Sequence, residues 1–188
     1  MDEVWNRIEA WLNANAPAVA AGLNPPASPD ELAETERYLG VRFPDGVRGS
    51  FLRHDGQSPD SPWMLDGWEL LSLGRIRNEW AVWKELLDDG SFADTESDTD
   101  GSEVRTDWWH PAWIPLTYDG GGNHHCLDLA PGPHGAPGQI IEMWHDEGSR
   151  PVVAPSFEDW LAGFADALEA GEFAFSDEEE ALCRREDP

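Results

Sequence analysis

The cluster His124-His125-Cys126 is the part of the sequence that comes closest to a metal site, because histidine and cysteine are usual ligands of zinc. On a strand, successive side chains point to opposite faces, so His125 would face away from His124 and Cys126. No second pair of ligands stands at a spacing typical of zinc, and a cysteine on a strand is more often a small core residue. We therefore predict no metal and no other cofactor. The other histidines are scattered along the chain at His54, His110, His134 and His145.

Patterns typical of catalysis are weaker still. The chain contains no GxSxG, HExxH or Walker-type glycine loop. The turn Asp119–Asn123 (DGGGN) resembles a phosphate-binding loop, but no helix follows it to hold an anion, and Asp119 would repel one. With 38 acidic residues, pairs of carboxylates arise by chance, so none can be nominated for acid–base work. We predict a protein that is not an enzyme.

The 11 tryptophans offer a different chemistry, the stacking of sugar rings. Trp108-Trp109 and Trp113 flank His110-Pro111 just before a predicted strand, and exposed members of such a group would form an aromatic platform. Core packing is the alternative, since tryptophan contributes a large buried area wherever its N–H finds a partner. A sugar-binding module is therefore kept as a third hypothesis, to be tested on a glycan array. The tryptophans on helical apolar stripes are Trp5, Trp11, Trp80, Trp83 and Trp160.

Charge and composition exclude several classes of protein. The chain has 38 Asp and Glu residues against 12 Lys and Arg residues, a formal net charge of −26, which would repel nucleic acid and anionic membranes. Its start has no basic segment followed by an apolar stretch, and no apolar run approaches the ~18 residues of a membrane span. The two cysteines, Cys126 and Cys183, fit a reduced compartment better than a disulfide scaffold. We predict a cytoplasmic protein with a protein partner.

Much of the acidity lies in two segments, residues 88–107 and 169–188, which hold eight acidic residues each. Their composition favours solvated, mobile segments that aid solubility. The alternative is an acidic arm that engages a basic partner.

The periodicity of apolar residues predicts an α+β fold, a single domain with a mainly antiparallel sheet packed against helices, because helices come first, strands cluster later and a helix closes the chain. We divide the chain into an N-terminal helix with an Ala/Pro-rich linker (1–27), an α+β domain (28–168) with the acidic insertion 88–107, and an acidic C-terminal tail (169–188). The predicted helices cover residues 3–14, 28–39, 47–52, 72–87 and 156–168. The predicted strands cover residues 63–65, 68–71, 114–118, 123–129, 139–145 and 150–154.

Two blocks of the sequence resemble the SUKH superfamily, which is named partly for the fungal cell-wall assembly regulators. The first block is Phe43–Arg48 (FPDGVR) followed by Phe51–Gly56 (FLRHDG). The second and more specific block is Trp113–Asn123 (WIPLTYDGGGN) followed by Cys126–Leu129 (CLDL). Phe43 replaces the usual leucine, and the acidic loop 88–107 is an insertion relative to the family pattern.

The resemblance implies an α+β fold and binding rather than catalysis. Bacterial members act as immunity proteins that neutralise toxins, often nucleases, and fungal members coordinate wall synthesis with signalling. Our main hypothesis from the sequence is an immunity protein whose acidic face blocks a basic toxin domain by steric and electrostatic occlusion. The alternative is a regulatory scaffold of the cell-wall assembly regulator type that binds a basic or disordered protein.

Turns and strand ends face outward, so they supply the predicted partner-binding residues. Asp55 and Asp119 have an alternative role, the closing of turns through local hydrogen bonds. The predicted partner-binding residues are His54, Asp55, Trp109, Asp119, Asn123 and His124.

Overall fold

A four-stranded antiparallel sheet forms the centre of the computed structural model, which describes residues 1–185. Its strand order is β2-β4-β5-β6, with β4 paired along its length to β5. A short ladder joins β1 to β3, and a separate hairpin joins β7 to β8. The strands are β1 (Glu69–Leu70), β2 (Trp113–Pro115), β3 (Thr117–Tyr118), β4 (His124–Asp128), β5 (Gln139–Met143), β6 (Val152–Ala154), β7 (Phe173–Ser176) and β8 (Ala181–Arg184).

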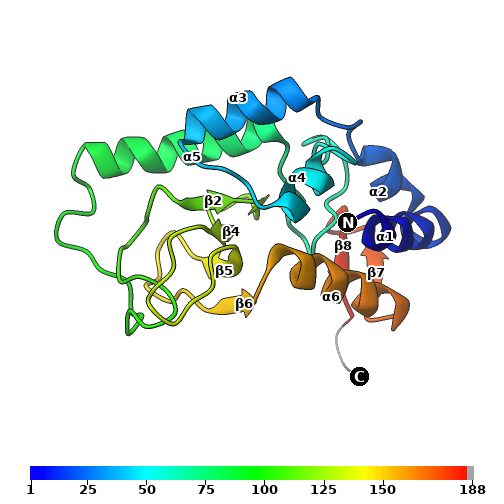
Figure 1. The fold of residues 1–188 in the computed structure, drawn as a ribbon. Coiled ribbons are helices and arrows are strands. Elements are labelled where there is room, and N and C mark those ends of the chain that lie inside the picture. Colours follow the sequence, from blue (N-terminus) through cyan, green and yellow to red (C-terminus); the bar gives the residue numbers. More distant parts are fainter. Residues whose placement is uncertain (186–188) are drawn as a thin grey trace.

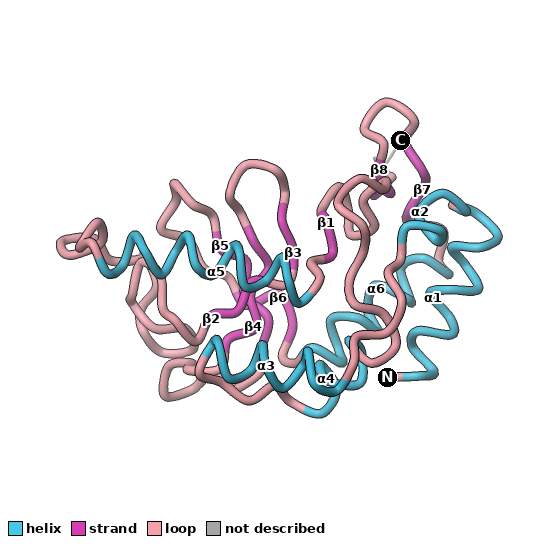
Figure 2. The backbone as a smooth tube through the Cα atoms, turned by 90° about the horizontal axis from the view of Figure 1, so that it is seen from above, coloured by secondary structure: helices cyan, strands magenta, loops and turns pink. Residues whose placement is uncertain are grey.

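Helices cover the sheet from two sides, which confirms the predicted α+β class. Helices α3 and α5 lie side by side above the sheet in the view of Figure 1, and α5 contacts β2. On the other side, α6 packs on β5 and β6 and also against α1, as the view from above shows (Figure 2). The helices are α1 (Asp2–Asn15), α2 (Pro17–Gly22), α3 (Pro29–Leu39), α4 (Asp45–Phe51), α5 (Leu73–Asp88) and α6 (Phe157–Glu169).

The predicted helix starts are confirmed, because local capping chemistry determines them. Ser28 and Glu31 form a reciprocal capping box at the start of α3, which ends at Gly40 in the left-handed conformation. Ser72 and Ser156 cap α5 and α6 by accepting hydrogen bonds from backbone N–H groups in the first turn.

Both ends of the chain are more structured than the sequence predicts. Helix α2 forms inside the predicted linker, and the β7–β8 hairpin forms inside the predicted acidic tail, where no strand was expected. The reason is burial: Phe173 and Leu182 are buried, so the hairpin has an apolar face beneath its charged turn. Residues 186–188 of the predicted tail lie outside the described residues.

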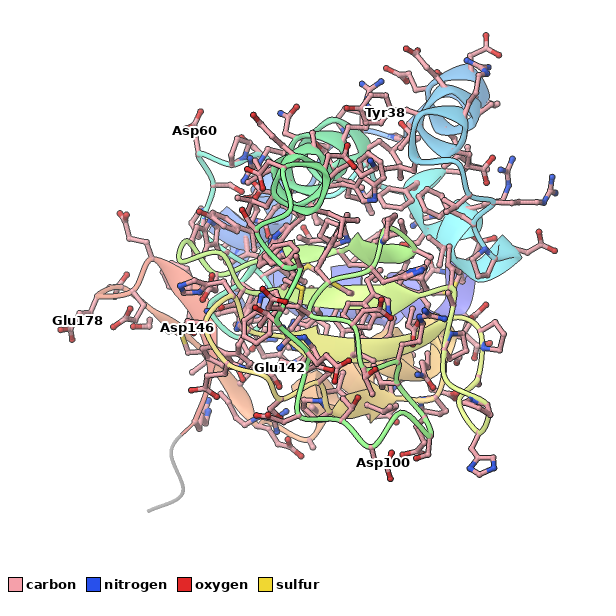
Figure 3. The ribbon with its side chains drawn as sticks, turned by 90° about the vertical axis from the view of Figure 1, so that its left-hand side faces the viewer. Tyr38, Asp60, Asp100, Glu142, Asp146 and Glu178 are labelled. Atoms are coloured by element: carbon pink, nitrogen blue, oxygen red, sulfur yellow. The ribbon has the colours of Figure 1, made fainter. Side chains whose placement is uncertain are left out.

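The acidic insertion 88–107 is docked on the body of the protein, so its interpretation as a wholly solvated segment is wrong. Val104 is buried, and the Glu103 carbonyl accepts hydrogen bonds from the Gly132 backbone N–H (3.0 Å) and from the Gln139 side chain (2.9 Å). The carboxylates still point outward, as Asp100 shows at the lower edge of Figure 3. Backbone contacts and two apolar residues, Val104 and Phe92, which stacks on Trp83, therefore anchor a segment whose composition resembles that of a disordered one.

Nine of the 11 tryptophans lie in the core or pack against it. Trp5, Trp109 and Trp113 are among the largest fully buried side chains, and Trp80 and Trp83 are also buried. The other six are partly buried: Trp11, Trp63, Trp68, Trp108, Trp144 and Trp160. Any aromatic binding surface must therefore be formed by the partly buried tryptophans.

Candidate functional site

The His54-Asp55 corner is held by internal hydrogen bonds. An Asp55 carboxylate oxygen accepts a hydrogen bond from the Leu73 backbone N–H (2.7 Å) at the start of α5. Burial raises the pKa of Asp55, against the effect of that hydrogen bond. His54 places Nδ1 2.9 Å from the Asn24 carbonyl and Nε2 2.9 Å from the Glu9 carboxylate. The Asp55 carboxylate therefore caps the start of α5, 18 residues along the chain, and does not close its own turn through a local hydrogen bond. Its contact with a partner stays a prediction.

The turn Asp119–Asn123 is organised around one carboxylate. Asp119 Oδ1 accepts hydrogen bonds from the backbone N–H groups of Gly121 (2.7 Å), Gly122 (3.0 Å) and Asn123 (2.9 Å). Its other oxygen accepts from the Asn123 side-chain amide. Burial acts to raise the pKa of Asp119, but these hydrogen bonds outweigh it and hold the pKa below its usual value. Hydrogen bonds within the turn therefore use the acceptor capacity of the Asp119 carboxylate.

His124 lies in the core and not at the surface. Its Nδ1 lies 2.6 Å from the Thr117 carbonyl, and Trp83 Nε1 donates a hydrogen bond to its Nε2 (3.3 Å). These partners fix a neutral ring protonated at Nδ1. Burial lowers the pKa of His124 to about 4, which agrees with a neutral ring at neutral pH.

Three of the six predicted contact residues are therefore removed from the proposed contact surface. His124, Trp109 and Asn123 are 0%, 2% and 4% exposed, so no partner reaches them in this conformation.

Within residues 1–185, no group of three or more His, Cys, Asp or Glu side chains is placed to hold a metal ion. Burial raises the pKa of the Cys126 thiol and so disfavours the thiolate that metal binding needs.

The neighbouring residue, His125, lines a mixed polar and apolar groove at the surface. Sheet residues from β4, β5 and β6 form one wall of this groove, α6 forms the other, and the β7–β8 hairpin closes one end. Its volume of about 510 Å³ lies within the range of about 300–1,000 Å³ typical of ligand sites. We call it the α6 groove. Its lining residues are Leu65, Asp66, Trp68, His125, Glu142, Val153, Ala154, Asp159, Trp160, Gly163, Phe164, Phe173 and Arg184.

Three rings form an aromatic floor in the α6 groove. The ring centroids of Trp68 and His125 are 4.5 Å apart, and those of His125 and Trp160 are 5.7 Å apart. Thr117 Oγ1 lies 3.0 Å from His125 Nδ1 and orients the ring. Burial lowers the pKa of His125 to about 4, so this floor is uncharged at neutral pH. The rings are not coplanar, since Trp68 and His125 are tilted by 52° and His125 and Trp160 by 42°.

Carboxylates surround the floor. Glu142 accepts a hydrogen bond from Trp144 Nε1 (2.8 Å), and Asp159 accepts one from the Ser156 hydroxyl (2.7 Å). In the described part of the chain, neither carboxylate forms an ion pair with Lys, Arg or His. Figure 3 shows Glu142 on the face turned toward the viewer, while Asp60, Asp146 and Glu178 project from turns at its edge. The groove therefore lies in a strongly anionic part of the surface.

The sequence contained partial indications of this site. Strand alternation placed His124 and His125 on opposite faces, but it did not tell which face is the core. Trp160 belongs to the apolar stripe of α6, and nothing local distinguishes an edge position of that stripe from a central one. The sequence places Trp68 in a predicted hairpin and indicates no binding role for it.

Helix α6 does not need a glycine at position 163. Replacing Gly163 therefore tests how closely the groove wall is packed. A Cβ added there meets nothing within 4 Å, and alanine has a higher helix propensity than glycine. We expect Gly163→Ala to raise the free energy of unfolding by up to about 1 kcal/mol, measured by urea denaturation. A loss of stability would mean that the wall is more closely packed than described.

The fold and groove define a small α+β domain whose exposed chemistry suits the binding of a cation-bearing partner. Comparison with known proteins then gives its family. A sequence profile described as the SMI1/KNR4 family (SUKH-1) matches residues 26–163, and the chain belongs to this family. The resemblance to the SUKH superfamily is thereby confirmed.

Curated relatives of the chain are named as regulators in fungi. It is 28% identical over 209 residues to "Cell wall assembly regulator SMI1" of Saccharomyces cerevisiae, covering 93% of the chain and 41% of the relative. It is 30% identical over 195 residues to "Cell wall biosynthesis/cell cycle regulator smi1" of Schizosaccharomyces pombe (97% and 39%). It is also 30% identical over 217 residues to "Glucan synthesis regulatory protein" of Neurospora crassa (97% and 41%). The chain spans about two fifths of the length of these relatives.

These names favour the regulatory alternative over the toxin-immunity hypothesis, and none of the three describes an enzyme. The search for membrane spans adds one finding: across residues 1–185, no helix combines the length and the apolar character that crossing a bilayer requires.

Proposed function

We propose that this chain is a non-enzymatic regulatory protein that acts by binding another protein through an anionic surface. The observation that carries the proposal is the α6 groove, an aromatic floor bordered by the carboxylates of Glu142 and Asp159, with which no cation of residues 1–185 forms an ion pair. The net charge of −26 adds long-range attraction for a basic partner. The names of the fungal relatives support regulation as the purpose of binding.

A capture experiment tests this proposal. The purified chain is immobilised and incubated with extract of the source cells, and the bound proteins are eluted with increasing salt. Raising the salt from about 0.15 M to about 1 M shortens the Debye length from about 8 Å to about 3 Å, so an electrostatic complex should be released. An unrelated protein of similar net charge is the control bait.

We expect a basic protein retained by the chain, absent from the control and released by salt. Its identity distinguishes the hypotheses, since a partner of wall synthesis or signalling supports regulation, whereas a secreted toxin supports immunity. Retention of no specific protein, or of a complex indifferent to salt, would contradict the proposal.

A further inference from the structure

The α6 groove has the chemistry of a guanidinium site, and this inference rests on the proposed function because it names what the groove receives. We propose that the groove binds an arginine side chain presented by an extended segment of a partner protein. The guanidinium stacks on the floor formed by Trp68, His125 and Trp160 and pairs with the carboxylates of Glu142 and Asp159. No covalent step is involved.

The first argument is the combination of π faces and carboxylates. A guanidinium over an aromatic face is attracted by the ring quadrupole, and the attraction grows as water is removed from the site. Glu142 and Asp159 come from opposite walls of the groove, β5 and the first turn of α6. A cation on the floor between them would lie between two negative charges. Burial of a cation in such a groove is favourable only when carboxylates of this kind compensate it.

The second argument is that the protein already holds one of its own guanidiniums in this way at one end of the same groove. The Arg184 guanidinium lies over the Phe173 ring, 4.9 Å from the ring centroid. It pairs with the Glu172 carboxylate and lies 3.8 Å from that of Asp66. Arg184, Phe173 and Asp66 all line the groove. At this end of the groove, a carboxylate and a ring hold Arg184. The other end has the same combination of carboxylates and rings, but no arginine of the described chain occupies it.

The choice of arginine over lysine follows from shape. Guanidinium is planar, stacks on aromatic rings and donates hydrogen bonds in a fixed fork, whereas the lysine ammonium is a compact and strongly hydrated charge. Two further arginines of the chain lie over aromatic rings, Arg75 over Tyr118 at 5.4 Å and Arg150 over Trp108 at 5.0 Å. The exposed Val153 and Gly163 leave the groove open to solvent, which suits an arginine carried on an extended segment.

The binding test uses three short Gly/Ser peptides that differ only at a central residue: arginine, lysine or citrulline, the neutral isostere of arginine. Affinity is measured by intrinsic tryptophan fluorescence and by calorimetry at low salt. We expect the arginine peptide to bind at least about tenfold more tightly than the citrulline peptide, with lysine in between. Equal affinity of the arginine and citrulline peptides would overturn the proposal, and equal affinity of the arginine and lysine peptides would overturn the choice of arginine.

Two variants test whether the arginine peptide binds in the α6 groove. Gly163→Trp fills the groove from a position where a Cβ meets nothing, and we expect it to weaken arginine-peptide binding at least about tenfold. Gly74→Trp is the matched control, since Gly74 is also helical, its Cβ would be 3.9 Å from the nearest atom, and it lies outside the groove lining. An unchanged affinity in Gly163→Trp, or an equal loss in both variants, would overturn the location.

Charge variants test the carboxylates without disturbing the fold. Glu142→Gln with Asp159→Asn keeps the acceptors for Trp144 and Ser156, and should reduce affinity at least about tenfold. Asp94→Asn with Glu85→Gln removes the same charge at exposed positions outside the groove and should change affinity by less than about twofold. Equal losses in the two pairs would overturn the specific role of Glu142 and Asp159.

Three further outcomes separate this inference from the proposed function. If Gly163→Trp still captures the partner from source cells, the groove assignment fails and the proposed function stands. If a glycan array finds a neutral sugar whose binding Gly163→Trp abolishes, the groove is a sugar site and the arginine assignment fails. If wild-type protein captures no partner at all, the proposed function itself fails.

Discussion

Replacing Asp119 by alanine is expected to lower the free energy of unfolding by about 3 kcal/mol. The change leaves the three backbone N–H groups of the turn and the Asn123 amide without their acceptor. Hydrogen bonds to a charged group contribute roughly 1.5–3 kcal/mol each, and the partly exposed turn retains some of its bonds through water. Asn123 also holds the His145 backbone N–H (2.8 Å), so the loss should extend to the loop after β5.

Urea denaturation of Asp119→Ala, with Asp94→Ala as an exposed control from the acidic insertion, measures this effect. Since the pKa of Asp119 is lowered in the folded state, its contribution is present at neutral pH and is lost as pH falls through the folded pKa, below the usual value of 3.8. The difference between wild type and Asp119→Ala should therefore stay constant between pH 7 and about pH 5. A loss no greater than that of Asp94→Ala would show that the turn does not depend on this carboxylate.

The second large effect is a loss of stability in mild acid caused by His124. Its pKa is about 4 in the fold against 6.5 in the unfolded chain, so between these values the unfolded state binds a proton that the folded state does not. Stability from this group is complete above pH 6.5 and falls as pH is lowered. Between pH 6.5 and about pH 5 the expected loss is about 2 kcal/mol, since each pH unit contributes about 1.4 kcal/mol.

His124→Gln isolates that contribution, because glutamine keeps a donor and an acceptor but does not titrate. We expect the stability of this variant to fall less steeply with pH than that of wild type, whatever its stability at neutral pH. His134→Gln, in the exposed loop 130–138, should keep the wild-type slope. The sequence pI is about 4.2, so unfolding is followed in dilute protein only down to about pH 5, where net charge still opposes precipitation. Parallel slopes for His124→Gln and wild type would refute the buried, neutral ring.

Local chemistry made much of the fold predictable. Ser28, Ser72 and Ser156 identify helix starts because the capping hydrogen bond lies within the first turn. Asp66-Gly67 identifies a tight turn, and both residues have the positive φ (53° and 77°) that this turn type needs. The pairing of β1 with β3 was missed because it joins segments far apart in the sequence. The β7–β8 hairpin is local, but the acidic turn obscures its apolar face.

The candidate site was less predictable than the fold. The DGGGN turn correctly indicated backbone hydrogen bonding by Asp119, which local sequence determines. His124 was predicted to contact a partner although His125 is the residue at the groove, because alternation gives relative faces but not which one packs on α5. Trp68 and Trp160 come together only through the docking of α6 on the sheet, a contact that no local pattern encodes.

Site-specific photo-crosslinking from position 153 tests the central claim most directly. A residue with a small diazirine side chain replaces Val153, an exposed residue that lines the groove, or Val82, an exposed residue outside it, and each protein is irradiated in extract of the source cells. We predict a crosslinked partner from position 153 but not from position 82, with a yield that falls as salt is added and when the arginine peptide, but not the citrulline peptide, competes. Equal products from both positions, or no product from position 153, would contradict the account.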